Sequence, residues 1–130
     1  YNSNGELFKE VRNSIHFGKD STLLTYQNGN LVNMKNWTEN GFFTEANYEY
    51  YTDLEAKSWY YSTMILYDMY RMPWVGALNK NLLKRQTGNI SGTPYNISYN
   101  YELNASGYVK SFTQVEPAGT SKHFMEYQCQ

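Results

Sequence analysis

Residues 95–109 read YNISYNYELNASGYV, and this stretch decides the fold class of the chain. Between Tyr95 and Leu103 every second residue is aromatic or aliphatic, and the residues between them are polar. A period of two places the apolar side chains on one face of a half-buried β-strand and the polar ones on the other. The polar segment 104–107 ends in Gly107, which can enter the left-handed region that a short turn needs. The stretch therefore predicts a hairpin with one apolar and one polar face.

The same order of aromatic strand end, polar turn with glycine and aliphatic restart is found at residues 1–7 and 26–32. In the second of these, Asn28-Gly29 is the strongest short hairpin signal, because both central residues of a type I′ turn need positive φ. Connections this short join only antiparallel neighbours. We therefore predict an all-β fold, an antiparallel meander sheet of hairpins rich in tyrosine and glycine. The remaining strands are predicted at residues 6–12, 22–27, 30–37, 42–51, 81–87, 107–115 and 121–128.

Residues 52–79 break this pattern and are predicted to form an insertion. Its first residues do not alternate, and the part that follows is crowded with Trp, Tyr and Met. A short helix around residues 60–70, ended before Pro73, or an irregular segment near 55–75 would cover one face of the sheet. We expect residues 1–130 to form a single β domain that contains this insertion.

The composition excludes some partners and supports a packed sheet. The 130 residues carry 11 basic and 12 acidic side chains, a net charge of −1 that offers no footprint for nucleic acid or for an anionic membrane surface. The chain has 14 Tyr, 6 Phe and 3 Trp. Tyrosine rings pack across strands while their hydroxyls stay in water, so a chain with a mean hydropathy of −0.71 can still bury a core. No apolar run approaches the ~20 residues of a membrane-spanning helix, so we expect no transmembrane segment.

The two ends of the sequence carry further expectations. The chain starts at Tyr1 inside a predicted hairpin and lacks an initiator Met, so we expect it to be a piece of a longer protein. Cys129 is the single cysteine, which excludes an intramolecular disulfide. An open edge strand at residues 1–12 would invite pairing with another chain, and we expect a homodimer through this edge.

Residues 99–111, YNYELNASGYVKS, resemble the C-terminal hairpin of a family of uncharacterised secreted Bacteroidetes surface proteins, commonly lipoproteins. Residues 26–32 and 48–53 are similar to earlier strands of that family, and residues 78–82 to the stretch after its long insertion. The resemblance covers the chain from about Thr22 onward and implies the C-terminal portion of a longer member.

Two positions depart from the family pattern, since Asn79 stands where Ser is usual and Leu83 where Pro is frequent. The family has no established activity, so the resemblance assigns no catalytic residue. It implies export, attachment at the outer membrane or cell surface, and no known cofactor.

The sequence offers little for catalysis. His16 and His123 lie on separate predicted hairpins without the spacing of a metal pair, and no phosphate loop, nucleophile elbow or zinc spacing occurs. Asp53 and Glu55 could act as paired carboxylates of a glycoside hydrolase, but an exposed turn is the interpretation that we favour. We expect no enzyme activity, no cofactor and no metal.

The aromatic insertion is the candidate binding surface, because exposed Trp and Tyr rings stack on sugars and anchor protein partners. The interpretation favoured by the sheet's need for a cover is that side chains of this segment, among them Trp59, Tyr61, Ile65 and Trp74, fill the core beneath it. Three functions stay open: a non-enzymatic surface module that binds a glycan or a protein, a structural spacer or shell segment of a larger surface protein, and a carboxylate-dependent hydrolase. The residues that we expect to bind a ligand are Tyr60, Tyr67, Tyr70 and Trp74.

Overall fold

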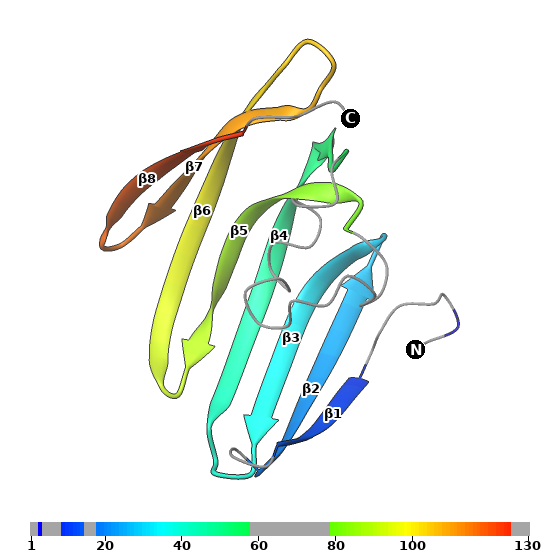
Figure 1. The fold of residues 1–130 in the computed structure, drawn as a ribbon, viewed down its shortest axis with the longest axis vertical. Coiled ribbons are helices and arrows are strands. Elements are labelled where there is room, and N and C mark those ends of the chain that lie inside the picture. Colours follow the sequence, from blue (N-terminus) through cyan, green and yellow to red (C-terminus); the bar gives the residue numbers. More distant parts are fainter. Residues whose placement is uncertain (1–2, 4–8, 15–17, 58–78, 126–130) are drawn as a thin grey trace.

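The computed structural model describes residues 3, 9–14, 18–57 and 79–125, and in these ranges the chain is all-β. The strands form one sheet in which each pairs antiparallel with the next along the chain, so the spatial order is the sequence order (Figure 1). This confirms the predicted antiparallel meander. The strands are β1 (Lys9–Ser14), β2 (Gly18–Gln27), β3 (Asn30–Thr38), β4 (Phe43–Glu55), β5 (Asn81–Ile90), β6 (Thr93–Leu103), β7 (Val109–Glu116) and β8 (Gly119–Phe124).

Two of the three predicted hairpin turns lie in the described ranges and are confirmed. Asn28 and Gly29 have φ values of 53° and 77°, as a type I′ turn between β2 and β3 requires. Between β6 and β7, the Asn104 side-chain oxygen accepts hydrogen bonds from the backbone N–H groups of Ser106 and Tyr108, both at 3.0 Å. The predicted hairpin at residues 1–7 falls, except for residue 3, outside the described residues.

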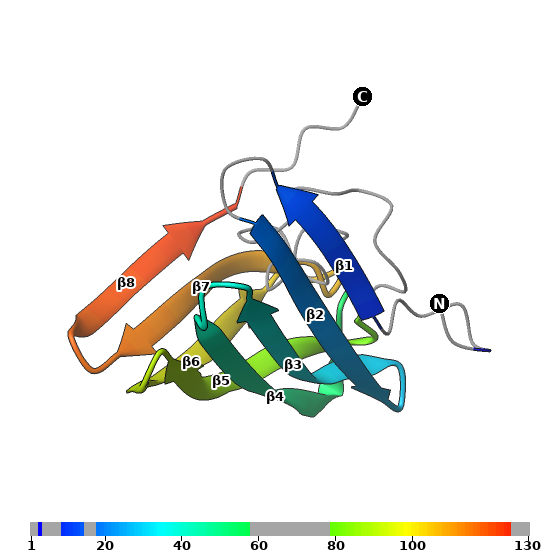
Figure 2. The same cartoon turned by 90° about the horizontal axis from the view of Figure 1, so that it is seen from below.

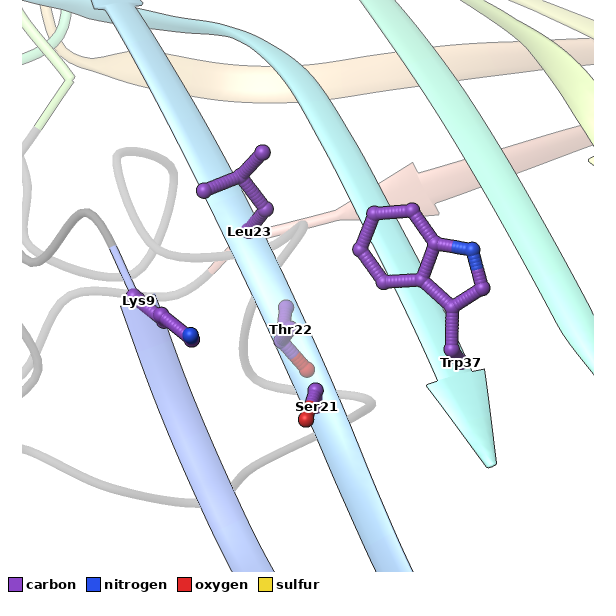
Figure 3. Close-up of a pocket in the computed structure, with 5 residues that line it drawn as sticks. All are labelled: Lys9, Ser21, Thr22, Leu23 and Trp37. Carbon is purple, nitrogen blue, oxygen red and sulfur yellow. The ribbon is translucent and has the colours of Figure 1, made fainter. Parts of the chain in front are cut away.

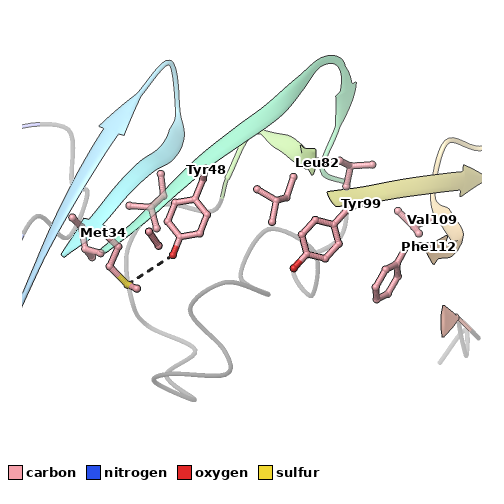
Figure 4. Packing of buried hydrophobic residues seen from close by; sticks show 10 residues of the cluster. Met34, Tyr48, Leu82, Tyr99, Val109 and Phe112 are labelled. Atoms are coloured by element: carbon pink, nitrogen blue, oxygen red, sulfur yellow. Dashed lines mark hydrogen bonds between the residues drawn. The ribbon is translucent and has the colours of Figure 1, made fainter. Parts of the chain in front are cut away.

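The sheet is curved (Figure 2), and the core lies on one of its faces, as the alternation predicted. Side chains from β2 through β7 meet there, and Figure 4 shows rings such as Tyr48, Tyr99 and Phe112 pointing to the same side. Met34 Sδ lies 4.0 Å from the Tyr48 hydroxyl in this cluster. Leu103, predicted on the same face as Tyr99, is 37% exposed at the end of its strand. The buried cluster comprises Leu24, Leu31, Met34, Ala46, Tyr48, Leu82, Leu83, Tyr99, Val109 and Phe112.

The insertion was predicted to begin at residue 52, which is too early, because strand β4 continues to Glu55. The β4–β5 ladder pairs Tyr50 with Leu83 and then Glu55 with Asn81, so residues 51–54 lie opposite Leu82 alone. Such a bulge interrupts the inward and outward alternation without ending the strand. This explains why the sequence lost its period of two there. The helix expected around residues 60–70 lies outside the described residues.

The flanks of residues 58–78 meet at one end of the sheet. The Ala56 N–H donates to the Lys80 carbonyl and the Lys80 N–H to the Gly29 carbonyl, both at 2.9 Å. Leu31, fully buried, lies past the end of the β3–β4 ladder. Its N–H donates to Asn79 Oδ1 and its carbonyl accepts from the Tyr50 hydroxyl, both at 2.7 Å. Side chains thus replace the missing ladder partners. No helix among the described residues is long and apolar enough to cross a membrane.

Candidate functional site

The binding residues expected in the insertion are not placed by the structure. Tyr60, Tyr67, Tyr70 and Trp74 lie outside the described residues, so their role stays a prediction. His16 and Cys129 also lie outside these ranges.

The remaining candidates for chemistry are exposed. Asp53 and Glu55 are exposed residues near the end of β4. His123 on β8 stacks on Phe112, with ring centroids 4.5 Å apart and planes 11° from parallel, and its Nε2 lies 3.1 Å from Ser121 Oγ. Within the described part of the chain, no three His, Cys, Asp or Glu residues gather as metal ligands would. None of these side chains lines the pocket described next.

The face opposite the core is mostly polar, but it carries an apolar patch over β1 to β4. In the strand register, Trp37 of β3 lies between Ser21 of β2 on one side and Phe43 of β4 on the other. Ser21 in turn pairs with Val11 of β1. Trp37 is 42% exposed and Val11 47% exposed. Large apolar groups are expected in the core, so their gathering on the polar face marks a surface for binding.

A pocket of about 340 Å³ opens in this patch (Figure 3). Ser21 is small and lies between the larger Val11 and Trp37, which leaves a hollow over β2. Thr22 is buried, and its hydroxyl accepts a hydrogen bond from Asn36 Nδ2 at 2.9 Å, which ties β2 to β3 beneath the hollow. We call this hollow the Trp37 pocket, and its lining residues are Lys9, Ser21, Thr22, Leu23 and Trp37.

The Trp37 ring is held in place before any ligand arrives. Its backbone belongs to the β2–β3 and β3–β4 ladders. The indole packs on the Phe43 ring, with centroids 5.7 Å apart and planes at 41°. A ring fixed on a rigid strand loses little conformational entropy when it binds, so Trp37 is a suitable anchor.

Two lysines lie near the pocket, Lys9 and Lys35, and only Lys35 forms an ion pair with another described residue. Lys35 lies beside Leu23 in the register, and its Nζ is 3.2 Å from Glu45 Oε1 on β4. The hydrogen bond from Lys35 and a second one from Asn33 Nδ2 lower the pKa of Glu45. The ionised carboxylate therefore stays paired with the ammonium of Lys35. Lys9, on the other side of Leu23, belongs to none of the ion pairs found among the described residues. Figure 3 shows its ammonium end pointing toward β2.

Sequence reasoning missed this site because it sought binding residues in the insertion. The signal was nonetheless present in the predicted strand 30–37. A period of two puts Trp37 on the same face as Asn33 and Lys35, away from buried Met34. A tryptophan on the polar face of a strand is the pattern that would have pointed to it.

Comparisons with known proteins provide no family. No model of a known protein family matches the chain, and no curated protein matches it either. Among solved structures the chain is similar to a porin-like protein from Bacteroides uniformis, with a TM-score of 0.46 and 13% sequence identity. The similarity covers 94% of this chain and 64% of that one, so the chain spans less than two thirds of the length of that protein.

Proposed function

We propose that the chain is a non-enzymatic surface module that binds a glycan through the Trp37 pocket. The observation that carries this proposal is an exposed indole, held by Phe43, beside a hollow on the polar face of the sheet. The apolar face of a sugar ring can stack on the indole while its hydroxyls reach Ser21 and water. The Trp37 pocket supplies this combination of a rigid ring and small polar surroundings.

A small glycan suits this surface better than a protein does. A volume of about 340 Å³ lies at the lower end of the range for small-molecule sites, about 300–1,000 Å³. A stable protein interface needs roughly 1,000 Å² or more of buried surface. We expect weak binding, with a Kd of about 0.1–1 mM, because a single ring and few polar groups contribute.

The proposed location is outside the cytoplasm, at the outer membrane or cell surface. The resemblance of residues 99–111 to a hairpin of Bacteroidetes surface proteins supports it. Its test is the N-terminus of the full-length precursor, where a signal peptide followed by a lipobox cysteine is expected. A precursor without any export signal would contradict the proposed location.

The binding proposal is tested with a glycan array, followed by NMR titration of each hit. We expect Trp37→Ala to abolish binding and Ser21→Tyr, which fills the hollow but keeps the indole, to weaken it at least about tenfold. Phe124→Ala is the matched control, because Phe124 is also an exposed aromatic, 71% exposed, on the distant strand β8. Circular dichroism of each variant separates loss of binding from loss of folding.

The same titration distinguishes the Trp37 pocket from the insertion. Binding that survives Trp37→Ala and Ser21→Tyr but is lost with Tyr67→Ala and Tyr70→Ala combined would place the ligand at the insertion instead. No binding across a broad glycan array would refute the function.

A structural spacer is the second candidate function. Its supporting observation is that β1 and β8 are the first and last strands of the sheet, and every residue of β8 is exposed. An edge of this kind could continue into the sheet of a neighbouring segment. A full-length protein that binds no glycan and whose amide exchange at β8 is slower than in this chain alone would favour the spacer.

A further inference from the structure

We propose that the Trp37 pocket selects acidic sugars, and that Lys9 binds the sugar carboxylate. This inference rests on the proposed glycan-binding function and names the class of ligand. The ligand would be a uronic acid, whose ring has an apolar face for the indole and whose edge carries one negative charge.

The spacing of the strands matches a single sugar ring. Lys9 and Trp37 both line the pocket from strands that flank β2 on opposite sides. Strands in a sheet lie about 4.8 Å apart, so the backbones of β1 and β3 are separated by about 10 Å. The two side chains narrow this width further. Lys9 pairs with Leu23, two residues along β2 from Ser21, so a ring stacked on Trp37 and extending over Ser21 has Lys9 diagonally beyond its far edge. The long, flexible lysine side chain can reach across this diagonal to a carboxylate on that edge.

Charge distribution makes Lys9 the recognising cation rather than Lys35. The ammonium of Lys35 is already bound to Glu45 at 3.2 Å, and a ligand carboxylate there would have to compete with that side chain. Lys9 takes part in no ion pair within the described residues, so a ligand carboxylate displaces no protein partner of this kind. A charge-assisted hydrogen bond from an ammonium to a carboxylate is stronger than one between neutral groups.

Exposure limits how large the preference can be. Lys9 is an exposed residue, and exposed ion pairs contribute little because water and salt screen them. We therefore expect a preference of at most about fivefold for the acidic sugar over its neutral counterpart. The preference should shrink as salt is added, because exposed charges are screened.

The test compares two β-1,4-linked tetrasaccharides, one of glucose and one of glucuronic acid, by NMR titration at low and high salt. We expect the wild-type chain to bind the glucuronic acid tetrasaccharide more tightly, by at most about fivefold. Lys9→Gln should remove this preference, so that the variant binds the two tetrasaccharides with equal affinity. Lys84→Gln is the matched control, because it removes the same charge from an exposed lysine that does not line the pocket.

The outcomes separate this inference from the proposed function. Equal binding of both tetrasaccharides, lost with Trp37→Ala, would overturn the acidic preference and keep the glycan-binding function. A preference that persists in Lys9→Gln would remove Lys9 from the site. Binding of neither tetrasaccharide, nor of any other glycan, would refute both proposals.

Discussion

Gly88, in the middle of the sheet, shows at the scale of single residues how closely the strands pack. It lies on the core face between Ala46 of β4 and Tyr95 of β6. A Cβ atom added at Gly88 would collide with the backbone oxygen of Glu45 and come within 2.7 Å of the Tyr95 hydroxyl. Backbone cannot move aside as a flexible side chain can, so a methyl group here must shift a strand.

We therefore predict that Gly88→Ala lowers the free energy of unfolding by about 1–3 kcal/mol. Urea denaturation followed by circular dichroism measures the effect. Thr87→Ala, the neighbouring position on the outer face, serves as control and should change the stability by less than about 1 kcal/mol. An unchanged denaturation midpoint for Gly88→Ala would show that the strands separate more easily than the structure indicates.

Asn79 is a second residue whose contribution can be measured, because its side-chain oxygen accepts a hydrogen bond from the buried backbone N–H of Leu31. Asn79→Ala leaves the Leu31 N–H without its acceptor, and we expect a loss of stability of about 1–3 kcal/mol. Asn40→Ala, in the exposed turn between β3 and β4, should be close to neutral. Thermal unfolding of the two variants provides the comparison, and equal melting temperatures would contradict the role assigned to Asn79.

Among the strands, β8 is secured to the sheet by an ionic contact on the outer face. Glu102 of β6 accepts a hydrogen bond from Lys122 of β8 at 2.7 Å and another from Ser111 of β7 at 2.8 Å. The contact with Lys122, followed by that with Ser111, lowers the pKa of Glu102 below its ordinary value of 4.5. One carboxylate thus links three consecutive strands.

The direction of this pKa shift predicts how β8 responds to acid. The pKa of Glu102 is lower in the folded than in the unfolded chain. Its ionised form therefore stabilises the fold fully at pH values above the unfolded pKa of 4.5. That contribution is lost as the pH falls through the folded pKa. We expect hydrogen exchange of the β8 amides, corrected for intrinsic rates, to show less protection in acid than at neutral pH.

Glu102→Gln isolates this effect from other acid-sensitive groups. The variant should reduce the protection of β8 at neutral pH, and its difference from the wild type should vanish once the pH has fallen below the lowered pKa of Glu102 in the folded chain. Glu49→Gln is the control, because Glu49 contacts Arg85 only at 4.0 Å on a strand pair away from β8. A wild type and Glu102→Gln that differ equally at all pH values would exclude ionisation as the cause.

For the molecule as a whole, the open sheet predicts self-association. The order of the strands leaves β1 and β8 at its two edges, and an uncovered edge strand can pair with another chain. The homodimer expected from the sequence remains a prediction, and light scattering after size-exclusion chromatography tests it. Val11→Lys adds a charge to the edge strand β1 and should weaken association. If the wild type and the variant are both strictly monomeric at high concentration, the predicted self-association is wrong.

The sequence by itself determined the fold class and most of the strand order. Tyr95, Ile97 and Tyr99 alternate with polar residues, and Asn28-Gly29 reverses the chain within a type I′ turn, so local rules were sufficient for the hairpins. The bulge at residues 51–54 was misread as the end of a strand, because its extra residues are defined by the partner strand β5. The amino acids next to the bulge in the sequence do not indicate how β4 pairs with β5.

Only the tertiary structure decided where the candidate site lies. Lys9, Ser21 and Trp37 come from three strands, and nothing in their separate segments shows that they share one hollow. Cross-strand register brings them together, and register depends on the burial of the opposite face, where Thr22, Leu24 and Met34 fix the alignment of β2 and β3. A periodic pattern specifies which face a side chain occupies, whereas a pocket requires knowing which side chains stand next to it.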